Sequence, residues 1–406
     1  MKKLWYLTIA LVLILAALSV PAVAAEEEPT QYTSGDYRYT LQPDGTAAIV
    51  KYTGSASELS IPDTLDGYAV TAIGNEAFLS CESLKNITIP DSVTSIGDGV
   101  FSGCSSLTSV TIPDGVTTIG DYAFVSCRSL TSVTIPDSVT TIGDYAFYSC
   151  DSLTSVTIPD GVTSIGDYAF CFCRALASIS LPDSVTTIGD YAFYFCGSLT
   201  SISIPDSVID MGSNPFLVCD NLTQIMVSPD HPVFATVDGV LFNKSEKKLV
   251  CYPYAFTQTS YTIPDGIRSI GECAFSFCNV LTSIAIPDSV TSIGDNAFSS
   301  CKSLTSITIP DSVTSIGNRA FSSCKSLTSI SIPGGVTSIG DGAFKSCDSL
   351  ANVSIPESVT SIGKYAFAEC SELLTLTVVR NSWAASWCKE NGMNYTYTDA
   401  LDWLKQ

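Results

Sequence analysis

The chain of 406 residues contains a single histidine, His231, in a proline-rich turn that begins at Pro229. A Ser–His–Asp or Cys–His catalytic arrangement would have to use this side chain. A zinc site is also disfavoured, because the sequence has no Cys-x-x-Cys pair and no second histidine. We therefore interpret His231 as a surface histidine, and we predict no catalytic residue, no metal and no cofactor.

Basic charge is scarce. The chain has 19 Lys and Arg against 40 Asp and Glu, which gives a formal net charge of −21. A surface this acidic repels nucleic acid and anionic membranes, so we expect neither as a partner. Charged residues make up only 15% and hydrophobic residues 46%, a composition that excludes a disordered chain.

Only one apolar run approaches the length of a membrane span. It covers residues 4–20, follows two lysines and leads into small residues that end at Ala25. This pattern predicts a secretory signal peptide over residues 1–25, cut after Ala24 or Ala25, and hence a secreted or cell-surface protein. A retained membrane anchor is the alternative. After cleavage we expect no membrane span.

Repetition is what the sequence has in abundance. Pairs such as Ile112-Pro113 and Ile135-Pro136 recur every 23 residues. Cysteine keeps the same period in two series: Cys81, Cys104, Cys127, Cys150, Cys173, Cys196 and Cys219, then Cys278, Cys301, Cys324, Cys347 and Cys370. A fixed period of about 20 to 50 residues indicates a repeat architecture, in which neighbouring units must stack to bury their apolar faces.

The repeat that ends at Cys127 reads LTSVTIPDGVTTIGDYAFVSC. Its first six residues match the L-x-x-L-x-L strand of leucine-rich repeats, and the intervening Ser and Thr face the opposite side of the strand. Pro113 ends that strand, because proline cannot donate to a ladder. We expect Asp121 to N-cap a short helical turn over residues 122–124, and Phe124 to close the core.

Repeats such as SLTSVTIPDSVTTIGDYAFYSC, residues 129–150, resemble the BspA-like class of leucine-rich repeats. The resemblance extends from about Tyr32 to the C-terminus. It implies a repeat solenoid: a right-handed leucine-rich-repeat superhelix with one short parallel strand and a short helical turn per 23-residue repeat, capped at both ends. It also implies a bacterial secreted or cell-surface protein. Several members of this class are linked to adhesion and to host or matrix binding.

Departures from the period define the predicted domains. A hairpin pattern around residues 43–45 predicts an N-terminal cap over residues 26–60, followed by the solenoid over residues 61–378. Between Cys219 and Cys278 the spacing is 59 residues, which is two periods plus 13. We interpret the excess as an irregular, hairpin-containing insertion near residues 228–257, which is either a binding feature or a family spacer.

The last segment, residues 379–406, is predicted to be the C-terminal cap. Its residues 382–391 have a helical pattern that ends before Gly392. We expect Trp383, Trp387 and Trp403 to cover the open edge of the last repeat.

Sixteen cysteines in a secreted chain would ordinarily suggest disulfides. The 12 periodic ones hold one equivalent position, however, and equivalent side chains on adjacent turns lie about 5 Å apart and point in parallel. Such a packed site suits a small buried thiol, so we predict free thiols. The cysteines outside the series are left open: Cys171, Cys251, Cys273 and Cys388.

Aspartates also recur in register, one row following proline, as Asp114 does, and one following glycine, as Asp121 does. Stacked carboxylates could bind calcium or imitate a glycosidase pair. Turn formation and helix capping explain the same rows, and a catalytic pair should break the repeat, whereas these aspartates obey it. Calcium binding stays open.

The ligand-binding candidates come from an asymmetry between the two halves of the repeat array. In the first half, the turn positions that follow the second aspartate row carry aromatic side chains, where the second half has residues such as Asn296 and Ser299. Rows of aromatics on a solvated edge are typical of binding surfaces, although they could also simply pack between turns. The candidate ligand-binding residues are Tyr122, Tyr145, Tyr148, Tyr168, Tyr191, Tyr194 and Phe195.

The sequence therefore predicts a non-enzymatic secreted or cell-surface binding or adhesion protein. The expected partner is an extracellular protein or polysaccharide that contacts the aromatic row and the Ser/Thr-rich strand face beside it. We expect this protein to be a monomer. A structural cell-envelope role without a specific ligand is the alternative, and a hydrolase with a site in the irregular repeat is a further one.

Overall fold

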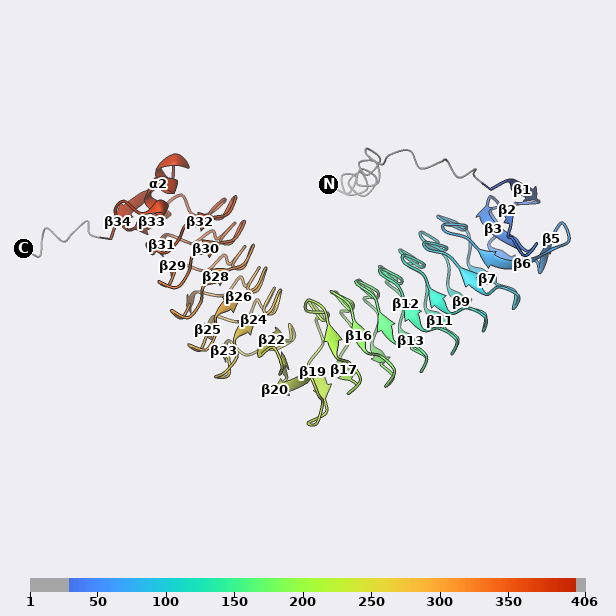
Figure 1. Cartoon of the computed structure of the whole chain (residues 1–406), viewed down its shortest axis with the longest axis horizontal. Helices are drawn as coiled ribbons and strands as arrows, with labels where there is room; N and C mark the ends of the chain where they lie inside the picture. The colour runs from blue at the N-terminus through green and yellow to red at the C-terminus, as the bar shows by residue number, and fades with distance from the viewer. Residues whose placement is uncertain (1–28, 399–406) are drawn as a thin grey trace, which may run out of the picture.

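The computed structural model describes residues 29–398, which form an open arc of stacked coils (Figure 1). The predicted signal peptide and Trp403 lie outside these residues. The coils follow one another in sequence order, and the arc bends close to β19 (Gln224–Val227) and β22 (Lys248–Cys251). We call residues 29–227 the first arm and residues 234–398 the second arm. The predicted solenoid is confirmed.

Each regular repeat forms two short strands, one more than predicted. In the repeat of β9 (Ser109–Thr111), the apolar centre of the strand is buried between two exposed hydroxyl residues, and β10 (Thr118–Ile119) follows after the Pro-Asp turn. Both strands pair in parallel with those of the next repeat, so that Val110 lies beside Val133 and Ile119 beside Ile142. In both ladders, each residue therefore pairs with the residue 23 positions further along the chain.

The strands of the first arm that carry the solvent-exposed Ser/Thr face are β7 (Asn86–Thr88), β9, β11 (Ser132–Thr134), β13 (Ser155–Thr157), β15 (Ser178–Ser180) and β17 (Ser201–Ile204). β19 continues this row but exposes Gln224 and Met226 instead. Their two-residue companions are β8 (Ser95–Ile96), β10, β12 (Thr141–Ile142), β14 (Ser164–Ile165), β16 (Thr187–Ile188) and β18 (Asp210–Met211).

The corresponding strands of the second arm are β23 (Ser260–Thr262), β25 (Ser283–Ala285), β27 (Ser306–Thr308), β29 (Ser329–Ser331), β31 (Asn352–Ile355) and β33 (Thr375–Val378). The two-residue strands there are β24 (Ser269–Ile270), β26 (Ser292–Ile293), β28 (Ser315–Ile316), β30 (Ser338–Ile339) and β32 (Ser361–Ile362).

The predicted helical turn in each repeat is wrong. The backbone N–H groups of Tyr122 and Phe124 donate to carbonyls of the next repeat, at 2.8 and 2.7 Å, and not along a helix. Asp121 does not cap a helix either, because its Oδ1 accepts a 2.8 Å bond from the N–H of Asp144. The backbone is left-handed at two positions in each turn, such as Tyr122 (φ 59°) and Ser126 (φ 60°). This conformation directs alternate N–H groups toward the neighbouring coil.

The core is a stack of equivalent side chains, one from each coil. Phenylalanine rings lie on one another along both arms; Phe124 and Phe147, for example, have ring centroids 5.2 Å apart. The periodic cysteines lie beside this stack, and their thiols donate to backbone carbonyls, as Cys150 Sγ does to Phe124 O at 3.2 Å. All 16 cysteines are unpaired, and only Cys81 and Cys370 are not fully buried, as expected of core thiols.

Each arm begins with the same antiparallel arrangement. In the first arm, β1 (Gln31–Ser34), β2 (Tyr37–Leu41) and β3 (Ala47–Tyr52) form a meander, and β3 then pairs in parallel with β6 (Tyr68–Ile73). In the second arm, β20 (Phe234–Val237), β21 (Val240–Asn243) and β22 form the meander, and β22 pairs in parallel with β24. Two further strands of the first arm, β4 (Glu58–Ser60) and β5 (Thr64–Leu65), precede β6.

The second meander lies between two separate hydrophobic cores. Leu241 and Val250 pack into the core of the first arm, whereas Phe242, Leu249 and Tyr252 pack into that of the second. Because side chains alternate across a strand, one two-sided hairpin closes the first arm and starts the second.

The C-terminal end is covered by α2 (Trp383–Glu390) and β34 (Tyr395–Tyr397), which pairs in parallel with β33. Ser382 N-caps α2 through a 3.1 Å bond from the N–H of Ala385. Trp387 packs edge-on against Phe367, the last ring of the phenylalanine stack, at 6.2 Å. Trp383 does not cover the edge as expected, because it is 41% exposed.

Candidate functional site

Four of the candidate residues form a continuous stack of tyrosine rings on the turn edge of the first arm. The rings of Tyr122 and Tyr145 are 5.1 Å apart and within 9° of parallel. Tyr145 and Tyr168 follow at 4.8 Å and 10°, and Tyr168 and Tyr191 at 5.1 Å and 29°. We call these four residues the tyrosine ladder. Its spacing equals the distance between neighbouring coils, so it arises directly from the repeat.

A second aromatic row runs beside the ladder. Tyr148 and Phe172 make an edge contact at 5.4 Å, and Phe172 stacks on Phe195 at 4.8 Å. Tyr194 packs against both phenylalanines and against Tyr191, which joins the two rows. The structure thus brings all seven sequence-predicted residues together on one edge, with Phe172, which the sequence also places beside this row, between Tyr148 and Phe195.

The ladder tyrosines occupy a strained backbone conformation. All four have φ between 54° and 59°, the left-handed region that bulky side chains rarely adopt. The second arm places Asn296 and Gly342 at two of the equivalent positions, with φ of 53° and 59°, and these residue types tolerate that conformation well. Its other equivalent positions hold Cys273, Arg319 and Tyr365, which are also left-handed. Tyrosine at such a position costs about 1 kcal/mol, which the ring contacts of the ladder offset.

The geometry determines which atoms of the ladder a ligand can reach. Each inner ring has both faces covered by its neighbours, so the ring edges and the phenol hydroxyls are what it offers to solvent. Tyr122, at the outer end, is 48% exposed. Burial raises the pKa of Tyr145 and Tyr148, and that of Tyr194 to about 12, so these phenols stay protonated near neutral pH.

Carboxylates line the same edge. The aspartate before each ladder tyrosine accepts a hydrogen bond from the backbone N–H of the equivalent residue in the next coil. Asp144 Oδ1, for example, accepts a 2.8 Å bond from the N–H of Asp167. Burial raises the pKa of Asp167. These hydrogen bonds between coils account for the regular row of aspartates. In the part of the chain that the structure describes, no cluster of three or more His, Cys, Asp or Glu could hold a metal ion.

The inner end of the ladder is packed against the second arm. The Tyr191 hydroxyl donates a 2.7 Å bond to Glu272 Oε1 and lies 3.3 Å from the Cys273 thiol. Tyr194 and Phe195 lie in the same apolar cluster as Cys273. Tyr191 and Phe195 therefore contribute to the structure at the bend, and the free part of the surface extends from Tyr122 to Tyr168.

His231 is not the surface residue that the sequence predicts. It is fully buried, and its Nδ1 accepts bonds from the N–H groups of Val233 and Phe234 at 3.1 and 3.0 Å. Since Nδ1 only accepts, Nε2 carries the proton and donates to Pro205 O at 3.0 Å. Every ring nitrogen is thus used to hold the turn before β20. The prolines around it indicated a turn, but nothing in the sequence indicated how it is buried.

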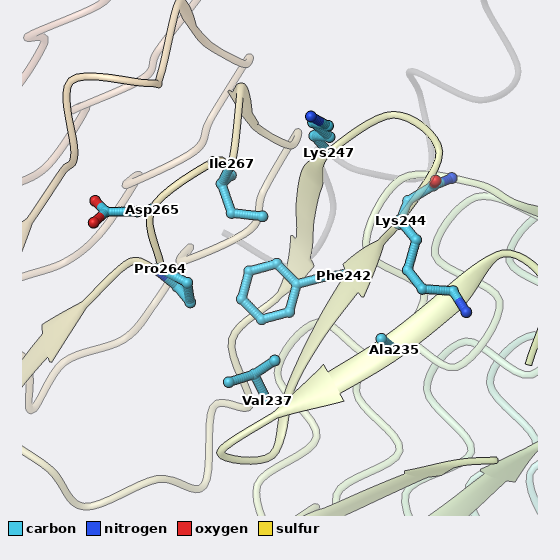
Figure 2. A pocket seen from close by; sticks show the side chains of 10 residues that line it. Ala235, Val237, Phe242, Lys244, Lys247, Pro264, Asp265 and Ile267 are labelled. Atoms are coloured by element: carbon cyan, nitrogen blue, oxygen red, sulfur yellow. The ribbon is translucent and has the colours of Figure 1, made fainter. Parts of the chain in front are cut away.

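The second meander, in the insertion for which the sequence leaves a binding role open, contains a hollow with a volume of 370 Å³ that the sequence did not predict (Figure 2). It lies between β20, β21 and the turn that precedes β24. Lys244 and Lys247 stand at its rim, in the loop joining β21 to β22. Lys244 Nζ donates to the backbone carbonyl of His231. The run of lysines in so acidic a chain is the signal that could have pointed to it.

These features define a leucine-rich-repeat solenoid of parallel two-strand coils. The model of the BspA type leucine rich repeat region matches residues 71–163, 140–253 and 249–374. The chain belongs to this BspA-type leucine-rich repeat family. No curated protein matches it.

Solved structures support the same assignment. A leucine rich cell surface protein from Faecalibacterium prausnitzii A2-165 is 40% identical over 89% of this chain and 98% of that chain, with a TM-score of 0.77. A leucine-rich repeat protein from Bacteroides ovatus ATCC 8483 is 30% identical over 90% and 99%, with a TM-score of 0.55. The pneumococcal vaccine antigen PcpA, 19% identical over 91% and 98% with a TM-score of 0.66, shares the fold.

Proposed function

We propose that this chain is a non-enzymatic binding protein, secreted or held at the cell surface, whose tyrosine ladder contacts an extended segment of an extracellular protein or polysaccharide. The observation that carries the proposal is the strained, solvent-facing ladder over residues 122–168. Tyr122, Tyr145 and Tyr168 place bulky rings at a left-handed backbone position that glycine and asparagine tolerate better.

The family and the N-terminal sequence pattern both support an extracellular binding role. The family is one of repeat proteins, and the similar Faecalibacterium prausnitzii protein is described as a cell surface protein. In residues 29–398 no helix is long and apolar enough to cross a membrane. The N-terminal residues have the pattern of a secretory signal peptide.

The chemistry of the ladder favours one kind of ligand. Covered ring faces cannot stack on the face of a sugar, except at the outer side of Tyr122. What remains is a line of phenol hydroxyls about 5 Å apart beside a row of carboxylates, an arrangement that accepts and donates hydrogen bonds and attracts positive charge. A neutral or basic extended segment fits this edge, and an acidic polysaccharide does not.

The test replaces ladder rings by a residue that the backbone accepts. In Tyr145→Asn and Tyr168→Asn the new side chain copies Asn296, so the left-handed conformation is kept. Tyr365→Asn is the matched control, because Tyr365 holds the same turn position in the second arm (φ 57°) and is exposed.

Binding is measured against ligands found by screening the mature chain on glycan and protein arrays. Each ladder variant is expected to lose about fivefold or more in affinity, and the control to lose none. If both ladder variants fold and bind as tightly as the unmodified chain, the ladder is structural. The ligand must then contact the Ser/Thr strand face or the second meander, or the protein has a purely structural role in the envelope.

A further inference from the structure

The hollow at the second meander has an apolar floor. The Phe242 ring points into it, and Pro264 and Ile267 from the turn before β24 stand opposite (Figure 2). Ala235 and Val237 of β20 complete the floor. Val237 is 45% exposed, so the hollow leaves apolar surface open to solvent.

The first arm contains the same structure with the hollow filled. The two meanders can be aligned by their strand pairing: Tyr39 lies beside Ile49 in the first, and Phe242 beside Leu249 in the second. The carbonyls of Ile49 and Leu249 accept equivalent bonds from the N–H groups of glycines at the start of the following turn, at 2.7 and 2.9 Å.

The ring stacks that follow are also equivalent. Tyr52 stacks on Phe78 at 5.3 Å and 30°, and Tyr252 on Phe275 at 5.1 Å and 29°. Tyr39 and Phe242 are therefore equivalent positions in two copies of one cap.

Tyr39 is fully covered by the chain's own side chains. Tyr32 of β1 stacks on it at 5.5 Å, and the Tyr68 ring lies 6.5 Å from it. Its hydroxyl donates a 2.9 Å bond to Asp66 Oδ2. Leu65, next to that aspartate, is buried as well. Tyr68, Asp66 and Leu65 all belong to the β5–β6 hairpin.

The second cap lacks the equivalents of both groups, and there the Phe242 ring is buried by the core of the second arm instead. Ala235 pairs with Phe242 where Tyr32 pairs with Tyr39, so one ring is missing. The β5–β6 hairpin is missing too, because Pro62 and Ile73 are 11 positions apart in the first arm, whereas Pro264 and Ile270 are 6 apart. The hollow is the space that a tyrosine ring and a five-residue hairpin tip occupy in the first cap.

The charge at the rim has also changed. The loop between β21 and β22 carries Lys244 and Lys247, both exposed, and the equivalent positions in the first cap are the uncharged Leu41 and Ala47. Lys248, the first residue of β22, is paired with Glu246 at 3.4 Å, and Lys244 Nζ donates to the backbone carbonyl of His231, so Lys247 is the rim lysine with neither kind of contact. Asp265 also lines the hollow, but its carboxylate points away from Phe242 (Figure 2). In a chain of net charge −21, this concentration attracts a negatively charged group.

We propose that the hollow is a second binding site, which accepts a loop of a partner protein bearing an aromatic side chain two positions after an acidic one. The aromatic ring packs on Ala235, Val237 and Ile267, at the place beside Phe242 that Tyr32 and Tyr68 occupy beside Tyr39, and the acid pairs with Lys247. The side chains of the first cap are the internal precedent for this occupant. The site is separate from the tyrosine ladder and does not depend on the ladder's function.

The probe is the capped tetrapeptide Leu-Asp-Gly-Tyr, the sequence of residues 65–68, titrated onto the full chain. Binding is followed by NMR of the methyl groups of Val237 and Ile267. We expect saturable shifts at both residues. An otherwise identical peptide with Asn in place of Asp should bind about two- to fivefold more weakly, as should the original peptide to Lys247→Asn, where asparagine tolerates the left-handed backbone (φ 51°).

The decisive variant fills the hollow from within. Ala235→Tyr copies Tyr32 and should abolish the shifts caused by the peptide while leaving the protein folded; Val237→Tyr is a second filling variant if the first misfolds. Thr308→Tyr, on the exposed face of β27, is the control and should bind normally. The proposal is overturned if the peptide causes no saturable shift at Val237 and Ile267, or if a folded filling variant binds it as well as the unmodified chain. Tyr145→Asn should leave peptide binding unchanged, which separates this site from the ladder.

Discussion

The hydroxyl of Tyr191 donates a 2.7 Å hydrogen bond to a carboxylate oxygen of Glu272, 81 residues further along the chain. The second oxygen of that carboxylate accepts a 3.0 Å bond from the hydroxyl of Ser213. Asn214 adds a 2.8 Å bond to the backbone carbonyl of Cys273. Three side chains of the first arm and its last turn thus hold the first turn of the second arm. These contacts cross the place where the arc bends and where the hydrophobic core is divided.

Removal of this hydroxyl should weaken the junction of the arms. Tyr191→Phe is expected to lower the free energy of unfolding by about 1–2 kcal/mol, because a half-buried carboxylate loses a donor. The measurement is urea denaturation followed by circular dichroism. Tyr168→Phe is the matched control, since the Tyr168 hydroxyl makes no side-chain bond within residues 29–398. Equal stability of the two variants would show that the contact contributes nothing.

The buried thiols predict a loss of stability in alkaline solution. Burial raises the pKa of Cys127 to about 12, and that of Cys150 and Cys301 well above the ordinary value of a thiol. Above about pH 8.5 the unfolded chain releases protons that the folded chain keeps, so unfolding becomes more favourable by about 1.4 kcal/mol per pH unit for each such thiol.

With many thiols in this state, the thermal midpoint should fall steeply between about pH 8.5 and 10. Thermal melts in that range measure it, and a midpoint independent of pH would contradict the prediction. In native protein below that range the thiols should resist alkylation, and all should react once the chain is unfolded without reductant. Thiols that stay unreactive in denaturant would be disulfide-bonded.

His231 predicts a separate effect in mild acid. Burial lowers its pKa, opposed by the bond to Pro205 O and by Asp206, and assisted by Lys244. The unfolded chain therefore takes up a proton that the folded chain refuses, so stability is full above about pH 6.5 and falls as the pH drops below it. His231→Asn retains an acceptor for the N–H groups of Val233 and Phe234 but does not titrate. The variant should lose the part of the acid dependence that the unmodified chain shows between about pH 6.5 and 5; identical pH profiles would exclude His231 as its source.

The leader predicts where the mature chain begins. The exported protein is expected to start at Ala25 or Glu26, because small residues at the end of the apolar run form the cleavage site. N-terminal sequencing of protein recovered outside the cytoplasm checks this. Folded protein that retains Met1 would favour the membrane-anchor alternative.

The repeat allowed much of the fold to be predicted from the sequence. A 23-residue period fixes the coil, and the alternation around Val110 places the apolar residues inside. The conformation of the turn was not predictable in this way. Asp121 before an apolar segment looks like a helix cap, but its true partner is the N–H of Asp144 in the next coil, and only stacking reveals that contact.

The candidate site shows the same division. The spacing of Tyr122, Tyr145 and Tyr168 predicted that they share an edge, and the structure places them in one stack. The contact between Tyr191 and Glu272 joins residues that are 81 positions apart, so no local sequence pattern could predict it. The hollow was not predictable for a different reason. It arises because the second cap lacks two groups that the first cap has, namely an aromatic ring at the position of Ala235 and a hairpin before β24.

The two-sided hairpin has a consequence for how such a protein can evolve. Leu241 packs into the core of the first arm and Phe242 into that of the second, so the two arms have separate hydrophobic cores that meet at this hairpin. Coils can be duplicated or deleted within one arm without changing the register of the other, as in any array whose units contact only their neighbours. The distance from the tyrosine ladder to either tip is then set by the number of coils, so related chains can space the same attachment points differently while keeping the bend between the arms unchanged.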